Sequence, residues 1–365
     1  MSSNTTDILT PWKEHLQVCG ARMDHDRVLG FEQNRNMESG TSGLETSMFA
    51  LSHLGILDVA GEEADSFLDA MLTVRVSDWN EHDLRLAALC DIKGRVLFVG
   101  WMWRCDAGFS WLLPGAELEA ARKTLQRYVL RAKVALIIRQ DVVVMGLVGA
   151  DASALIRHEN LPFADRGMMR SDDVSVAALP RAGDKDRLLI LGRPDTLISL
   201  WRHFQEQCRP SGYNGWELYA IQACEPCVSG GLKGELVAQM INLDWLGAVD
   251  FDKGCYIGQE VIARLHYRGR ASRRMFRGKV SSDAIVLVEA GMKLWSDAQG
   301  GQMLGMVIRS ARGIDGGWSL LASVRLEDRE ATLPMSAWID GVRREAIVWE
   351  HDPCGLVVPE SPQSS

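Results

Sequence analysis

The sequence lacks an apolar run long enough to cross a membrane. Its longest apolar stretches, 134–138 and 142–148, are far shorter than the roughly 20 residues that a membrane-spanning helix needs. Residues 1–12 have neither the basic start nor the apolar segment of a secretion signal. We therefore expect a cytoplasmic protein without a membrane partner.

Cysteine and positive charge are both scarce. Eight cysteines in 365 residues are too few for a disulfide scaffold, and we expect them to stay reduced in the cytoplasm. The formal net charge is −8, which excludes a protein whose whole surface binds nucleic acid. We expect no direct nucleic-acid partner, and any anion site must be local.

Common catalytic signatures are also absent. The sequence contains no P-loop, no G-x-G-x-x-G after a predicted strand, no H-E-x-x-H and no G-x-S-x-G, which disfavours nucleotide hydrolysis and zinc proteolysis. Cys224 and Cys227 have the spacing of a redox or zinc pair, but they follow a predicted helix at 216–223 instead of starting one. A chance pair is favoured over either role, and we expect no metal site.

Length and composition indicate a globular protein of two or three packed units. The chain is 47% apolar and 24% charged, and its mean hydropathy is −0.06. Strand and helix patterns mix over most of the sequence, and short β runs divided by glycines follow residue 279, which predicts an α+β fold with a C-terminal all-β barrel. The expected divisions are a poorly ordered start at 1–15, a main domain at 16–278, a barrel at 279–357 and a disordered tail at 358–365.

Hydrophobic periodicity and turn residues predict the individual elements. Asp91, Ile92, Lys93 and Gly94 form a hairpin turn between two of the strands. The predicted strands are 51–59, 84–90, 95–103, 134–139, 142–148 and 187–191, and the predicted helices are 62–72, 115–133, 151–157, 195–207, 216–223 and 259–265.

The segment 253–260, Lys-Gly-Cys-Tyr-Ile-Gly-Gln-Glu, carries the strongest local signal. It places Cys255 just before a predicted helix, where Lys253 and the positive helix end favour a reactive thiolate. Glycines at 254 and 258 would let a partner approach closely. A cysteine packed in a tight turn explains the residues equally well.

Seven cations follow within 261–282, a stretch without a single acid. Such a run could bind a phosphate backbone, a polyglutamate tail or an acidic partner, and the alternative is a solvated hairpin face. The cations are Arg264, Arg268, Arg270, Arg273, Arg274, Arg277 and Lys279.

The 253–260 motif resembles the YgfZ-type folate-binding family, which is related to the glycine-cleavage T-protein, an aminomethyltransferase. Segments 51–55, 89–95 and 239–243 extend the resemblance, which covers roughly 20–347. It implies an aminomethyltransferase-like fold of packed α/β subdomains around a folate pocket, with a C-terminal β-barrel. It also implies a role in iron–sulfur cluster assembly or repair, with indirect effects on tRNA modification.

The resemblance further implies the site residues and partners. Cys255 and Lys253 are the expected reactive residues, tetrahydrofolate or a folate derivative is the expected cofactor, and iron–sulfur assembly or client proteins are the expected partners. The implied folate-binding residues are Gln222, Asn242, Tyr256, Gln259, Glu260, Arg264, Tyr267 and Arg270.

Two departures from the T-protein pattern, at 98–99 and at Gln222, bear on the mechanism. Phe98 and Val99 stand where the T-protein has two aspartates, and hydrocarbon cannot relay a proton. Gln222 stands where the T-protein presents a glutamate to the pterin, and Cys224 stands where relatives usually have glycine. The loss of the two aspartates disfavours glycine-cleavage chemistry, and we do not expect a classical enzyme. The alternatives are a tetrahydrofolate-dependent aminomethyl or one-carbon transferase, and an RNA-binding or adaptor module that uses the arginine-rich segment.

Overall fold

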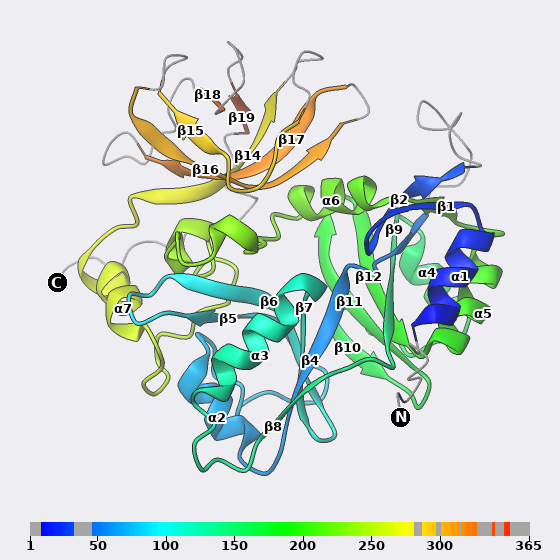
Figure 1. The fold of residues 1–365 in the computed structure, drawn as a ribbon, viewed down its shortest axis with the longest axis horizontal. Coiled ribbons are helices and arrows are strands. Elements are labelled where there is room, and N and C mark those ends of the chain that lie inside the picture. Colours follow the sequence, from blue (N-terminus) through cyan, green and yellow to red (C-terminus); the bar gives the residue numbers. More distant parts are fainter. Residues whose placement is uncertain are drawn as a thin grey trace, which may run out of the picture. The chain divides into compact units, whose positions relative to one another are not determined.

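The computed structural model describes residues 9–32, 46–280, 287–296, 301–313, 316–326, 338–339 and 347–350. Figure 1 labels the helices and strands named below. Contacts divide the chain into two compact units. Unit 1 comprises Met1–Ala64, Trp79–Leu84 and Met102–Tyr219, and unit 2 comprises Asp65–Asp78, Arg85–Trp101 and Ala220–Ser365. Each unit is therefore assembled from separated stretches of sequence.

Unit 1 is built on a six-stranded sheet in the order β10-β11-β12-β9-β3-β13. Its pairings are antiparallel except for the parallel pair β13 and β3. Every residue of β9 is buried, which explains its continuous apolar sequence. The strands are β3 (Ser47–Ala50), β9 (Val143–Gly149), β10 (Gly167–Arg170), β11 (Val174–Ala182), β12 (Lys185–Gly192) and β13 (Arg209–Ser211).

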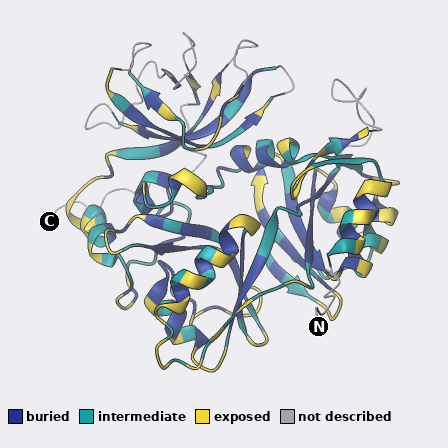
Figure 2. Cartoon of the chain, in the orientation of Figure 1, coloured by how far each residue is buried: buried dark blue, intermediate teal, exposed yellow. Residues whose placement is uncertain are grey.

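Helices α1 (Thr10–Val18), α4 (Ala152–His158) and α5 (Pro194–Phe204) share one core with this sheet. The apolar residues of α5 recur at helical spacing, and its Trp201 meets Trp12 of α1 edge-on at 5.7 Å between ring centroids. The prediction that 1–15 is poorly ordered is wrong for 10–15, because burial of Trp12 holds α1 in the core. Figure 2 shows the buried residues concentrated along the strands.

Unit 1 also contains an antiparallel group in which β4 pairs with β7 and β8. Helix α3 is shorter than the predicted helix 115–133: its apolar face ends at Leu125, and Tyr128 and Leu130 beyond it are exposed. The elements are β1 (Ala21–Asp24), β2 (Arg27–Phe31), β4 (Leu54–Ala60), β7 (Gly108–Pro114), η2 (Gly115–Glu117), α3 (Leu118–Gln126) and β8 (Ala135–Ile138).

Unit 2 begins in α2 and contains the site residues discussed below. Strand β5 coincides with the predicted strand 84–90, and α7 extends the predicted helix by three residues, to Arg268. The elements are α2 (Ala64–Met71), β5 (Leu84–Cys90), β6 (Val96–Cys105), α6 (Tyr213–Gln222), η3 (Gly230–Leu232), η4 (Ala238–Ile241) and α7 (Gln259–Arg268), of which α2, β6 and α6 cross between the units.

The last part of unit 2 is an all-antiparallel sheet in the order β18-β15-β16-β17-β14-β19. It has its own apolar core, which confirms the expected all-β character of the C-terminal region. Strand β14 pairs with β17 from Arg273 onward, so the sheet begins before the expected boundary at 279. The strands are β14 (Arg273–Val280), β15 (Lys293–Trp295), β16 (Met303–Arg312), β17 (Trp318–Arg325), β18 (Trp338–Ile339) and β19 (Val348–Trp349).

None of the described helices is both long and apolar enough to cross a membrane.

Candidate functional site

Cys255 lies on a short loop, residues 253–258, that leads into α7. We call this segment the Cys255 loop. Gly254 and Cys255 are exposed, whereas Lys253 and Tyr256 on either side of them are buried. The Lys253 ammonium lies 5.1 Å from the centroid of the Tyr256 ring, a cation–π distance. The two exposed residues are therefore flanked by buried side chains that contact each other.

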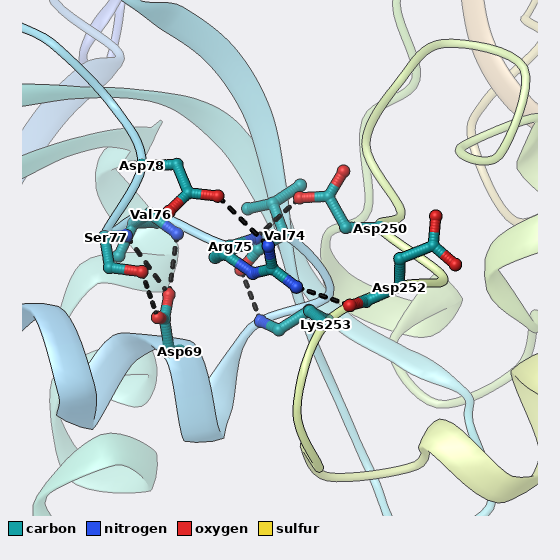
Figure 3. Close-up of polar contacts among 9 residues, drawn as sticks. All are labelled: Asp69, Val74, Arg75, Val76, Ser77, Asp78, Asp250, Asp252 and Lys253. Carbon is teal, nitrogen blue, oxygen red and sulfur yellow. Dashed lines mark hydrogen bonds and ion pairs between the residues drawn. The ribbon is translucent and has the colours of Figure 1, made fainter.

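The Lys253 ammonium donates hydrogen bonds to two backbone carbonyl oxygens from a distant part of the sequence. The acceptors are Leu72 O at 2.9 Å and Val74 O at 2.5 Å, on the segment that follows α2. Figure 3 shows the lysine reaching this segment. Burial lowers the pKa of Lys253 to about 8, although the carboxylates of Asp69 and Asp250 act in the opposite direction.

Two carboxylates hold the same segment, residues 72–78, which we call the acceptor segment (Figure 3). Asp69 accepts hydrogen bonds from Val76 N and Ser77 Oγ, both at 2.6 Å. Asp250 accepts one from Arg75 N at 2.6 Å, and its own N–H donates to Thr73 O at 2.9 Å. The backbone of the acceptor segment thus forms hydrogen bonds both with Asp69 in α2 and with Asp250, three residues before Lys253.

The Arg75 side chain adds a further connection between these two stretches of sequence. Its guanidinium bonds to Asp78 at 3.1 Å and also donates to the backbone carbonyl of Asp252. Asp252 is the residue immediately before Lys253, so the acceptor segment contacts the Cys255 loop and the residue that precedes it.

The two glycines of the Cys255 loop have different environments. Gly258 has φ +84°, and a Cβ there would lie 2.4 Å from Asp91 O and 2.8 Å from Gly94 Cα. A Cβ at Gly254 would meet nothing within 4 Å. The expectation that both glycines open the thiol to a partner is therefore wrong for Gly258, which packs against the turn before β6, and only Gly254 faces open space.

A cavity of about 590 Å³ lies beside the start of the Cys255 loop. Phe251 stacks on His266 of α7 with 3.6 Å between ring centroids, and Tyr267, one of the expected folate-binding residues, is 58% exposed at the cavity wall. The lining residues are Arg75, Asp78, Arg85, Val249, Asp250, Phe251, Asp252, His266 and Tyr267.

Asn242, another expected folate-binding residue, is fully buried. Its amide nitrogen donates to Met275 O at 2.8 Å and its amide oxygen accepts from Met275 N at 3.1 Å. Both ends of the amide are therefore used to join the end of η4 to β14. Asn242 therefore has a structural role, and its role in folate binding stays a prediction.

Gln239 is a buried polar residue that the sequence did not single out as a ligand. It is 2% exposed, and its amide nitrogen donates to Ile262 O of α7 at 2.7 Å. Its amide oxygen Oε1 has no hydrogen-bond partner within the described structure, and such an acceptor suits a donor on a ligand. Gln239 lies in one of the segments that carry the family resemblance, but only the fold shows that its amide oxygen has no partner among the described residues.

Comparison with known proteins gives relatives over most of the chain. No family model matches. The chain is 29% identical over 235 residues to the tRNA-modifying protein YgfZ of Colwellia psychrerythraea, covering 64% of this chain and 71% of that protein. It is 27% identical over 258 residues to the tRNA-modifying protein YgfZ of Klebsiella pneumoniae, covering 70% and 78%.

The chain is thus similar to YgfZ proteins over 64–70% of its length, at 27–29% identity. Among solved structures, it resembles the glycine cleavage system aminomethyltransferase T from Bartonella henselae, with a TM-score of 0.75 and 16% identity over 94% of this chain and 97% of that one. This similarity confirms the expected α+β, aminomethyltransferase-like fold.

The other residues expected to bind folate differ in how far their side chains are exposed. Gln222 is exposed at the end of α6, and its backbone oxygen accepts from Arg277 at 2.8 Å. Gln259 is half-buried and Glu260 exposed in the first turn of α7. Tyr256 is buried, and burial raises the pKa of its hydroxyl.

The arginine-rich segment is partly neutralised by acids from outside it. Arg274 bonds to both oxygens of Asp244, at 2.6 and 2.9 Å, and Glu350 lies 2.7 Å from Arg277 and 3.7 Å from Lys279. These three cations have structural partners. The three expected to form an anion site, Arg264, Arg268 and Arg270, are exposed.

The positions that carry aspartates in the T-protein pattern are apolar and buried here. Phe98 and Val99 on β6 are 4% and 3% exposed, and the Lys233 ammonium lies 5.5 Å from the Phe98 ring centroid. These side chains offer no carboxylate for proton transfer.

The Cys224 and Cys227 spacing does not reflect a mutual disulfide. Cys224 is in a disulfide whereas Cys227 is not, so the expectation that all cysteines stay reduced is wrong for Cys224. Cys224 has φ +56°, a left-handed conformation that glycine adopts more easily. Among the described residues, no group of three or more His, Cys, Asp or Glu side chains could hold a metal ion.

The contrast between the two loop glycines predicts unequal effects of alanine. Gly258→Ala should lower the free energy of unfolding by about 3 kcal/mol, because the new methyl group meets backbone atoms at a positive φ. Gly254→Ala should change it by less than about 0.5 kcal/mol. Urea denaturation of both variants measures the difference, and equal losses would show that Gly258 does not pack against the turn.

The low pKa of Lys253 predicts a dependence of stability on pH. Between pH 8 and its ordinary value of 10.5, the unfolded chain keeps a proton that folded Lys253 has lost, so stability rises with pH. From about pH 7.5 to about pH 9.5, the free energy of unfolding of the wild type should rise by about 2 kcal/mol relative to Lys253→Met.

Asp69, Asp250, Arg75 and Tyr256, the groups that face the ammonium, are present in both proteins, so the difference isolates Lys253. Urea denaturation across this range provides the measurement. A constant or falling difference would mean that the ammonium is solvated.

Proposed function

We propose that this protein binds a reduced folate and acts in iron–sulfur cluster assembly or repair through Cys255. The single observation that carries the proposal is the exposed thiol on a loop whose flanking residues are buried. Cysteine thiolates are the usual protein ligands of iron–sulfur clusters, and an exposed one can reach a cluster or a partner protein.

The residues present fit a folate in part. Folates carry an amino-substituted ring with hydrogen-bond donors at one end and carboxylates at the other. The unpaired amide oxygen of Gln239 and the exposed amide of Gln222 would accept from the ring, and exposed Arg264 and Arg268 would attract the carboxylates. Asn242 also has a structural role, because its amide bonds to the Met275 backbone at both ends.

Aminomethyl transfer of the T-protein type receives no support from the site. That reaction needs carboxylates where Phe98 and Val99 form part of a buried apolar core. The folate would then serve a step other than glycine cleavage. A role in tRNA modification, suggested by the names of the relatives, would be indirect and would pass through enzymes that contain iron–sulfur clusters.

Folate binding is tested directly by titration calorimetry with tetrahydrofolate. The wild type should bind, and the double variant Arg264→Glu, Arg268→Glu should bind on the order of tenfold more weakly because the carboxylates lose their cations. Arg127→Glu, an exposed charge reversal in unit 1, is the matched control and should bind like the wild type. The folate proposal fails if the wild type gives no heat at millimolar ligand.

The role of Cys255 is tested in cells that lack their own YgfZ-type protein. Cys255→Ser should fail to restore the activity of iron–sulfur enzymes, because serine keeps the size of the side chain but loses the thiolate. Cys105→Ser, which changes another free and partly accessible cysteine, should restore it fully. Full rescue by Cys255→Ser would show that the Cys255 thiol is not needed for this activity.

A further inference from the structure

The ammonium group of Lys253, in the Cys255 loop, already donates hydrogen bonds to backbone carbonyl oxygens. Lys253 is 7% exposed, and its donors go to Leu72 O and Val74 O. A charged donor forms stronger hydrogen bonds than a neutral one, and two buried carbonyl oxygens without partners would cost free energy. These contacts give Lys253 a structural role that does not require it to act on the Cys255 thiol.

The carbonyl oxygens that receive Lys253 are themselves held in place. Asp69 binds the backbone N–H groups of Val76 and Ser77, and Asp250 binds that of Arg75. The acceptor segment therefore presents its carbonyl oxygens from a fixed backbone, which lets a single ammonium define where residue 253 lies.

The residues that follow the exposed pair Gly254 and Cys255 are fixed as well. The Tyr256 ring is buried and lies within cation–π distance of the same ammonium, and Gly258 packs on the backbone of Asp91 and Gly94. Gly254 and Cys255 are thus a two-residue exposed span between fixed points. A thiol held in this way loses little conformational freedom when a partner binds it.

We propose that Lys253 is a positioning residue that fixes the Cys255 loop by binding the carbonyl oxygens of Leu72 and Val74 and the ring of Tyr256. This inference rests on the proposed function in one respect only, which is that the position of the Cys255 thiol matters for activity. It replaces the expectation that Lys253 acts as the electrostatic activator of Cys255, because the ammonium is directed to buried carbonyl oxygens while the thiol is exposed.

Hydrogen exchange measured by mass spectrometry separates positioning from activation. In Lys253→Met, amide exchange should accelerate on the order of tenfold in both 72–77 and 252–257, two segments far apart in sequence. Strand β12 of unit 1 should exchange as in the wild type. Lys253→Arg, which keeps donors and charge, should restore much of the protection, and Lys93→Met, the same change at an exposed position of unit 2, should have no effect.

The same variants are then alkylated across a range of pH, and labelling at Cys255 is quantified. Positioning predicts that Lys253→Met leaves the midpoint of the pH profile unchanged and the rate within about twofold, since the thiol is exposed in both proteins. An upward shift of the midpoint with unchanged exchange would establish activation and overturn the proposal. Faster exchange throughout the protein, including β12, would also overturn it, by showing a general loss of stability.

Neither measurement uses folate, a cluster or a client protein. Failure of the positioning role is therefore distinguishable from failure of the proposed function. The proposed function is tested separately, by whether Cys255→Ser restores the activity of iron–sulfur enzymes.

Discussion

The arrangement of the site depends on one buried ammonium group. Lys253 joins the loop that carries Cys255 to a segment 181 residues earlier through Leu72 O, and the cost of its burial is visible in a pKa lowered to about 8. The hydrogen bonds that the carboxylates of Asp69 and Asp250 accept from backbone N–H groups of the acceptor segment make this arrangement possible, because they fix the backbone whose carbonyl oxygens bind the ammonium. Without these hydrogen bonds the carbonyl oxygens of Leu72 and Val74 would not be held in position. They would then compensate less of the free-energy cost of burying the Lys253 ammonium.

The consequence for function is a separation of roles within one short motif. Lys253, Tyr256 and Gly258 are used for structure, by hydrogen bonding, burial and close backbone packing respectively. Gly254 and Cys255 are left facing solvent. A sulfur atom presented on a rigid support can meet an external cluster or partner without first ordering the loop. The absence of carboxylates at Phe98 and Val99 agrees with a chemistry that differs from aminomethyl transfer.

Local patterns in the sequence predicted much of the fold but only part of the site. Strand β5 and helices α5 and α7 follow from hydrophobic periodicity, and the motif around Cys255 follows from its residues. The partners of Lys253, Gly258 and Arg274 could not be predicted, since Leu72, Asp91 and Asp244 are brought to them by the tertiary fold. The same limit applies to Asn242, whose amide bonds to Met275, a strand residue that no local pattern connects with it.

The most direct test of this account is nitrogen-15 NMR of the Lys253 side chain, assigned by comparison with Lys253→Met. A buried Lys253 should give an ammonium resonance protected from solvent exchange, titrating near pH 8, with contacts to the Tyr256 ring. A rapidly exchanging ammonium that titrates near the ordinary lysine value of 10.5 would show a solvated side chain and would contradict the claim that Lys253 holds the Cys255 loop in place.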